Sequence, residues 1–135
     1  MSTRAKKSTV NRIIDANINR VKEGLRVCEE VTRFILNSRT LCLELKTLRH
    51  EIDSIAKGLA AKKELLRERS VQKDVGRNMG GNELNRDSLQ DIFFANIQRA
   101  KESVRVLEEF SKLININSAL RFKRVTYKIY AVEKK

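Results

Sequence analysis

Residues 16–30 read ANINRVKEGLRVCEE, and residues 95–109 repeat this string as ANIQRAKESVRVLEE. Ten of these fifteen positions are identical at a constant offset of 79 residues. In both copies the apolar residues recur every three or four positions, which is the spacing of one face of an amphipathic helix. The duplication therefore predicts two equivalent helices within one chain.

Most of the residues retained in both copies are polar, and helical spacing places many of them on one stripe. The stripe of the first copy consists of Ala16, Arg20, Glu23, Val27 and Glu30. Its twin in the second copy consists of Ala95, Arg99, Glu102, Val106 and Glu109. An apolar stripe lies nearly opposite in the first copy and predicts a separate core-facing side. Core packing alone requires no particular arginine or glutamate, so the retained charges need another explanation.

The composition describes a basic protein of one domain. Its 135 residues suffice for a single domain, 1–135, with a buried core. The formal net charge of +12 favours an anionic partner: a phosphorylated small molecule, nucleic acid or an acidic lipid surface. No run of about 18 apolar residues and no apolar leader is present, so we expect a cytoplasmic protein without a membrane segment. We expect the two cysteines, Cys28 and Cys42, to be free, structural thiols.

Hydrophobic periodicity predicts four long helices, since the chain has no proline to interrupt them. The first is expected to begin at an N-cap of Ser8 or Thr9 and to end at about Asn37, with apolar positions that reach Ile35. The second is expected over about residues 40–69, and the glycine-containing stretch 70–87 is expected to be a loop.

The second half of the chain repeats this pattern. A third helix is expected over about residues 88–114, and a fourth from a cap at Asn117 or Ser118 to the C-terminus, with Leu120 on its apolar side. Repeat 1 (about 9–69) and repeat 2 (about 88–134) are then two long helical hairpins. Together they predict an all-α, pseudo-symmetric four-helix bundle.

Two explanations compete for the retained charges. Intrahelical ion pairs, such as Glu23 with Arg20 or Arg26, are worth ~0.2–0.5 kcal/mol each and would tolerate lysine or aspartate. A site for phosphate would instead require arginine, because its planar fork matches phosphate oxygens, and neighbouring carboxylates suit magnesium. Neither a GxxxxGK[ST] nor a GxGxxG motif is present to favour a particular nucleotide-binding fold.

Four segments of the chain resemble one known family: residues 12–30, Leu48-Arg49-His50, residues 69–76 and residues 95–109. They are similar to a small helical bacterial domain that is assigned as an alternative type of hydroxymethylpyrimidine phosphate kinase. That domain is often fused ahead of a thiamine phosphate synthase barrel. The resemblance covers nearly the whole chain. It implies ATP-dependent phosphorylation of hydroxymethylpyrimidine phosphate to the diphosphate in thiamine biosynthesis. We expect Mg²⁺ as a cofactor from the chemistry of phosphoryl transfer.

The resemblance also yields candidate site residues, to which we assign roles by their chemistry. As catalytic residues we predict Arg20, Glu23, Arg99 and Glu102. As binding residues for the substrate and the nucleotide we predict Asp15, Asn17, Arg26, Arg49, Asn96 and Arg105. As magnesium ligands we predict Glu23, Glu102 and Asp74. We favour one composite site that draws on both copies over two separate sites.

Two other functions are compatible with the same sequence. A basic helical bundle can bind nucleic acid, although six retained glutamates would repel phosphate along the repeated helices. A non-catalytic accessory or dimerisation domain of thiamine phosphate synthase is the other alternative, in which the stripe would be an interface, including one between two copies of the chain. The single histidine, His50, is expected to be structural or partly exposed.

Overall fold

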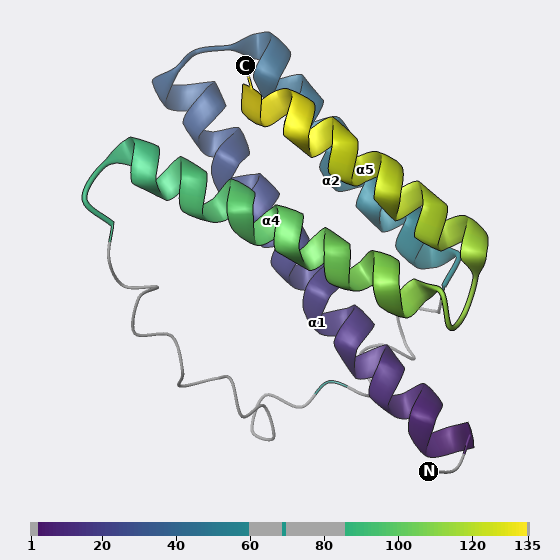
Figure 1. Ribbon diagram of the computed structural model, residues 1–135. Helices are drawn as coiled ribbons and strands as arrows, with labels where there is room; N and C mark the ends of the chain where they lie inside the picture. The colour runs from purple at the N-terminus through teal and green to yellow at the C-terminus, as the bar shows by residue number, and fades with distance from the viewer. Residues whose placement is uncertain (1–2, 60–68, 70–85, 135) are drawn as a thin grey trace.

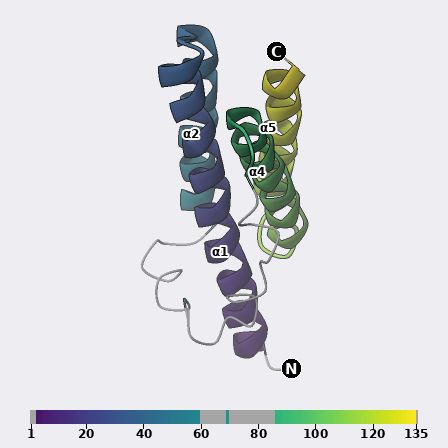
Figure 2. The same ribbon diagram turned by 90° about the vertical axis from the view of Figure 1, so that its left-hand side faces the viewer.

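Four α-helices and one short π-helix account for most of residues 3–59, 69 and 86–134, which are the residues that the computed structural model describes. The helices are α1 (Thr3–Glu30), η1 (Val31–Ile35), α2 (Arg39–Lys57), α4 (Leu89–Ser111) and α5 (Ile116–Lys134). Helix α1 packs against α2 and α4, and α5 packs against the same two helices (Figures 1 and 2). Each helix runs antiparallel to its neighbours. The predicted all-α four-helix bundle is confirmed.

The two hairpins, α1–α2 and α4–α5, are held together internally by equivalent ion pairs. Lys22 of α1 reaches Asp53 of α2 with an Nζ–Oδ1 distance of 2.8 Å. Its counterpart in the repeat, Lys101 of α4, reaches Glu133 of α5 with an Nζ–Oε2 distance of 2.8 Å. The retained lysines therefore perform the same structural task in both copies.

The core is formed by the apolar stripes of all four helices. On α1 it contains Val10, Ile14, Ile18, Val21, Leu25 and Cys28, as the sequence predicted. Two predicted core positions are wrong: Ile35 is 45% exposed and Leu120 is 48% exposed. Ile35 lies at the end of the π-helix beside other exposed apolar residues, and Leu120 faces outward because the buried positions of α5 are Ala119, Phe122 and Val125. None of the described helices is long and apolar enough to cross a membrane.

The first helix differs from its predicted bounds at both ends. Ser8 and Thr9 lie inside α1 and not at its N-cap, because the residues before them are good helix formers and include no helix breaker. The α-helix ends at Glu30, and the backbone continues as the wider π-helix Val31–Ile35. Asn37 closes this segment with a φ of 52°, a left-handed conformation that asparagine tolerates better than most residues.

The bounds of the second and fourth helices also need correction. Helix α2 starts behind its cap Ser38 and ends at Lys57, well before residue 69, because Gly58 and Leu59 donate to carbonyls only three residues earlier. Residues 60–68 and 70–85, which include most of the predicted loop, lie outside the described residues. The cap of α5 is Asn115, whose Oδ1 accepts from the backbone N–H groups of Asn117 and Ser118.

Helices α1 and α4 approach each other closely at Gly24. A Cβ atom at this position would lie 2.8 Å from the carbonyl oxygen of Asn96, so no side chain fits without a shift of backbone. Farther along the same contact, the Cys28 thiol donates to the Phe93 carbonyl at 3.6 Å. Gly24 therefore sets the separation of the two helices that carry the repeated string.

We predict that Gly24→Ala destabilises the protein, because relieving the contact with Asn96 requires α1 and α4 to separate. The expected loss of about 1–3 kcal/mol is partly offset by the ~1 kcal/mol that alanine gains in a helix. Chemical denaturation monitored by circular dichroism measures the difference. Gly58→Ala is the matched control, since the nearest described atom to its Cβ is 3.4 Å away and its φ is −81°. Equal stabilities of the two variants would contradict this role of Gly24.

Candidate functional site

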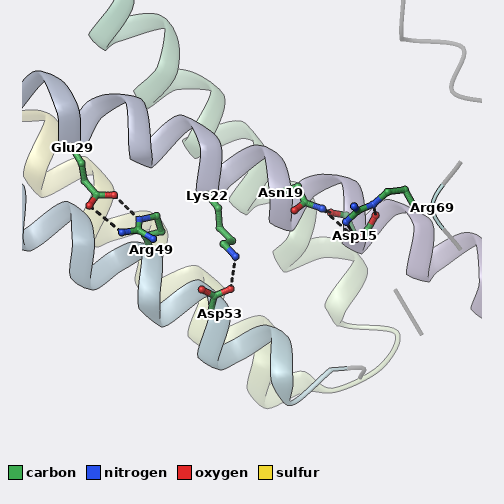
Figure 3. Close-up of polar contacts among 7 residues, drawn as sticks. All are labelled: Asp15, Asn19, Lys22, Glu29, Arg49, Asp53 and Arg69. Atoms are coloured by element: carbon green, nitrogen blue, oxygen red, sulfur yellow. Dashed lines mark hydrogen bonds and ion pairs between the residues drawn. The ribbon is translucent and has the colours of Figure 1, made fainter. Parts of the chain in front are cut away.

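Part of the retained charge joins helices and is structural. The Arg49 guanidinium on α2 donates two hydrogen bonds to the Glu29 carboxylate on α1, from Nε to Oε2 at 2.6 Å and from Nη2 to Oε1 at 3.2 Å (Figure 3). Glu29 is 4% exposed, and its hydrogen bonds raise the pKa of Arg49 above the usual arginine value. The pair therefore fixes α1 against α2. The sequence predicted Arg49 as a binding residue but gave no signal for this partner.

The counterpart of Glu29 has a different partner in the second copy. Glu108 accepts from Arg105 of its own helix, Nη1 to Oε2 at 2.8 Å, and Arg105 also reaches Glu109 at 3.1 Å. A hydrogen bond from Lys112 is the main cause that lowers the pKa of Glu109. In the first copy Arg26 pairs with Glu30 at 3.4 Å. These are intrahelical pairs of the kind that the simpler explanation predicted, but the structure pairs Arg26 with Glu30, and the predicted pair of Glu23 with Arg20 or Arg26 does not occur among the described residues.

Four retained charged residues are not accounted for in this way: Arg20, Glu23, Arg99 and Glu102. All four are exposed. Within the described part of the chain, neither arginine pairs with a carboxylate. Arg20 Nη1 has only a long contact of 3.4 Å to Asn17 Oδ1, and Glu102 accepts from Gln98 at 3.1 Å. They are the same four residues that were predicted to be catalytic.

The antiparallel contact of α1 and α4 brings Arg20 and Arg99 to a similar level of the bundle. Arg20 lies one turn before Gly24, and Arg99 lies about one turn after Asn96, the residue that Gly24 contacts. Glu23 and Glu102 are three residues farther along each helix, on the same side of it. The two arginines therefore lie near the middle of the crossing, and the two glutamates lie about one turn to either side of them, all four on exposed positions of α1 and α4.

Asp15 lies on another side of α1 and has a partner that sequence reasoning missed. It is 5% exposed and accepts two hydrogen bonds from Arg69, Nε to Oδ2 and Nη2 to Oδ1, both at 2.8 Å (Figure 3). Asn19 also donates to Asp15 Oδ1 at 3.2 Å. The hydrogen bond to Asp15 is the main cause that raises the pKa of Arg69, and the charge of Glu23 contributes. A separation of 54 residues left no periodic signal for this pair.

The two retained asparagines bind their own helices. Asn17 Nδ2 donates to the Ile13 carbonyl and Asn96 Nδ2 to the Ile92 carbonyl, both at 2.8 Å. Each amide group therefore keeps its oxygen and one N–H for other partners, and the Asn17 oxygen already accepts from Arg20. Asp74 lies outside the described residues, and within those residues no group of three or more metal-binding side chains occurs.

The predicted site residues thus fall in several places. Arg26 and Arg49 line a cleft of about 500 Å³ at the turn between α1 and α2. Arg105 is engaged near the C-terminal end of α4, and Asp15 faces Arg69. Only the residues around the α1–α4 crossing combine contributions from both copies. That surface is the best candidate for the composite site.

Sequence relatives show the class of protein to which this helical domain corresponds. The chain is 42% identical over 125 residues to a thiamine-phosphate synthase of Nostoc punctiforme, covering 92% of this chain and 34% of that protein. It is 37% identical over 130 residues to a thiamine-phosphate synthase of Rhodopirellula baltica, covering 96% of this chain and 34% of the relative. The chain therefore spans about a third of the length of these curated relatives.

The sequence model of the ThiD2 family matches residues 12–135, and the chain therefore belongs to this family. This membership and the relatives link the chain to thiamine biosynthesis. No solved structure matches the chain significantly.

The cysteines are free, as predicted. Burial is the main cause that raises the pKa of Cys28 from 9.0 to about 12, whereas Cys42 is partly exposed beside the cleft. At pH 8 Cys28 is therefore a protonated thiol.

We predict that a thiol reagent modifies Cys42 in the native protein and Cys28 only after unfolding, which mass spectrometry of the labelled peptides measures. Equal native labelling rates would contradict this assignment.

We predict that Arg49→Met destabilises the fold by about 3 kcal/mol, because the buried Glu29 carboxylate is left without its partner. Arg26→Met is the control, since the Arg26–Glu30 pair is about half exposed and should contribute less than about 1 kcal/mol. Denaturant unfolding of both variants measures the difference. If Arg49→Met lost no more stability than Arg26→Met, the Glu29–Arg49 pair would not be a structural clamp.

Proposed function

We propose that the chain is a kinase that transfers the γ-phosphoryl group of ATP to hydroxymethylpyrimidine phosphate and produces the diphosphate. Membership of the ThiD2 family and relatives from thiamine biosynthesis support this proposal. The single structural observation that carries it is the duplicated arginine–glutamate set at the α1–α4 crossing, whose arginines have no carboxylate partner among the described residues.

In this proposal Arg20 and Arg99 bind phosphate oxygens of the donor and the acceptor and align them. An oxygen of the acceptor phosphate attacks the γ-phosphorus, the bond to the β-phosphate oxygen breaks, and ADP leaves. The attacking phosphate is already ionised at neutral pH, so no side chain has to remove a proton. The arginines stabilise the negative charge spread over the transferring oxygens.

Glu23 and Glu102 are the residues that would hold magnesium. Their exposed carboxylates fit it, because magnesium is commonly bound by one or two carboxylates together with substrate phosphates and water. When bound, the ion supplies neutralisation of phosphate charge. Asp74, predicted as a third ligand, is a further candidate outside the described residues.

A second function is favoured by one observation. Because the chain spans about a third of its relatives, which are named thiamine-phosphate synthase, it corresponds to one part of a larger protein. An accessory role would be to bind the remaining two thirds of such a protein without catalysis. Gel filtration of this chain mixed with that remaining part, produced separately from a relative, tests binding. A kinase assay on this chain alone tests catalysis.

We predict that the purified chain forms the pyrimidine diphosphate from ATP, magnesium and the pyrimidine monophosphate, and that Arg20→Ala lowers turnover by about 10²–10³-fold. Glu23→Gln should lower turnover and raise the magnesium concentration needed for half-maximal rate. A coupled assay for ADP measures both. Arg124→Ala, which removes an exposed arginine of α5, is the matched control and should keep normal turnover.

Circular dichroism distinguishes loss of chemistry from loss of fold in these variants. If a folded Arg20→Ala protein and a folded Glu23→Gln protein both turned over at the normal rate, the α1–α4 surface would not be the catalytic site. If the wild-type chain produced no diphosphate but bound the remaining part of a thiamine-phosphate synthase, the accessory function would replace the kinase.

A further inference from the structure

A second positively charged surface lies away from the α1–α4 crossing, in the cleft of about 500 Å³ formed by the end of α1, η1 and the start of α2. Five basic residues line it: Arg26, Arg33, Arg39, Lys46 and Arg49. A volume of this size is in the range of small-molecule sites. The proposed kinase site does not use this cleft.

Two of the five cations are already neutralised, and three are not. Arg49 and Arg26 pair with Glu29 and Glu30, which also line the cleft. Within the described residues, the other three cations, Arg33, Arg39 and Lys46, have no carboxylate partner. Arg33 instead lies over the Phe34 ring, 4.7 Å from its centroid. Among the described residues, the cleft therefore holds three positive charges without a carboxylate partner.

The local backbone adds to this positive potential. Helix α2 begins at Arg39 behind the Ser38 cap, and its first turn contains no acidic residue. Helix N-termini carry partial positive charge, so an arginine there is unfavourable unless an anion lies nearby. The unpaired Arg33 lies on η1, a π-helical turn of the kind that often occurs at functional sites.

The second hairpin provides an internal comparison, because it preserves the fold but only part of the charge of this cleft: Arg33 and Lys46 correspond to Lys112 and Lys123. The caps Ser38 and Asn115 align at an offset of 77 residues, which matches Arg39 with Ile116 and Arg49 with Thr126. The segment after α4 is a turn over residues 112–114 and contains no π-helix. The first hairpin therefore differs from the second by Arg39, Arg49 and the π-helix, and the bundle alone does not require these three features.

We propose that this cleft is a binding site for a small molecule with a diphosphate or longer phosphate chain. Arg33, Arg39 and Lys46 would bind the phosphate oxygens, aided by the N-terminus of α2. The half-exposed Leu43 and the partly buried Cys42 line the same cleft and would contact the organic portion of the ligand. The proposal does not rest on kinase activity, since it concerns binding at different residues.

Isothermal titration calorimetry tests this proposal by measuring the affinity of the protein for inorganic pyrophosphate and, in a second arm, for ATP. Both titrations are carried out without magnesium. The test variant is the triple substitution Arg33→Gln, Arg39→Gln and Lys46→Gln. The control is Lys112→Gln, Lys123→Gln and Arg124→Gln on the second hairpin, which removes the same charge and includes the counterparts of Arg33 and Lys46. Circular dichroism and thermal unfolding establish that both variants are folded.

We expect the cleft variant to bind pyrophosphate about tenfold more weakly or worse, and the control to bind within about twofold of wild type. Tighter binding of ATP than of pyrophosphate that is lost in the cleft variant and kept in Arg20→Ala would identify a nucleotide as the ligand class of the cleft, and equal binding would identify the diphosphate group alone. Equal losses in both variants would show non-specific attraction to net charge and overturn the proposal. So would unchanged binding in the cleft variant.

Arg20→Ala separates this inference from the kinase proposal. The substitution should leave pyrophosphate binding to the cleft unchanged, whatever it does to turnover. If Arg20→Ala abolished pyrophosphate binding while the triple cleft variant retained it, the phosphate site would lie at the α1–α4 crossing and the cleft proposal would be wrong.

Discussion

The close contact between α1 and α4 is the constraint on which the rest of the structure depends. Gly24 has no side chain, whereas any other residue here would place a Cβ against the Asn96 carbonyl. The two helices can therefore approach to the distance at which their apolar stripes share one core. The same contact brings the two copies of the repeated string together in antiparallel order. Any composite site built from both copies depends on this crossing.

The retained charges have different purposes, which the sequence alone does not separate. Lys22 and Lys101 join each helix to its hairpin partner, and Glu29 binds Arg49. Once these structural pairs are accounted for, Arg20 of the first copy and Arg99 of the second, which have no carboxylate partner in the part of the chain that the structure describes, lie at the helix crossing. A duplicated fold can thus keep one set of charges for assembly and another for a ligand.

Hydrophobic periodicity predicted most of the fold, because the core positions of α1 and α2 follow the spacing of three or four residues that the sequence itself contains. It failed at Ile35, which lies beyond the end of α1, and at Leu120, which lies one position away from the buried series Ala119, Phe122 and Val125. The Asp15–Arg69 and Glu29–Arg49 pairs were not predictable, since their partners are 54 and 20 residues apart and no periodic rule connects them. The cleft was missed for the same reason.

The central claim is that the two copies contribute to one site and not to two. The most direct test compares the turnover numbers of Arg20→Ala and Arg99→Ala in the pyrimidine phosphate kinase assay, with both proteins shown to be folded. One composite site predicts that each single substitution removes nearly all of the activity. Two independent sites would leave each variant with about half of the wild-type turnover, which would contradict the claim.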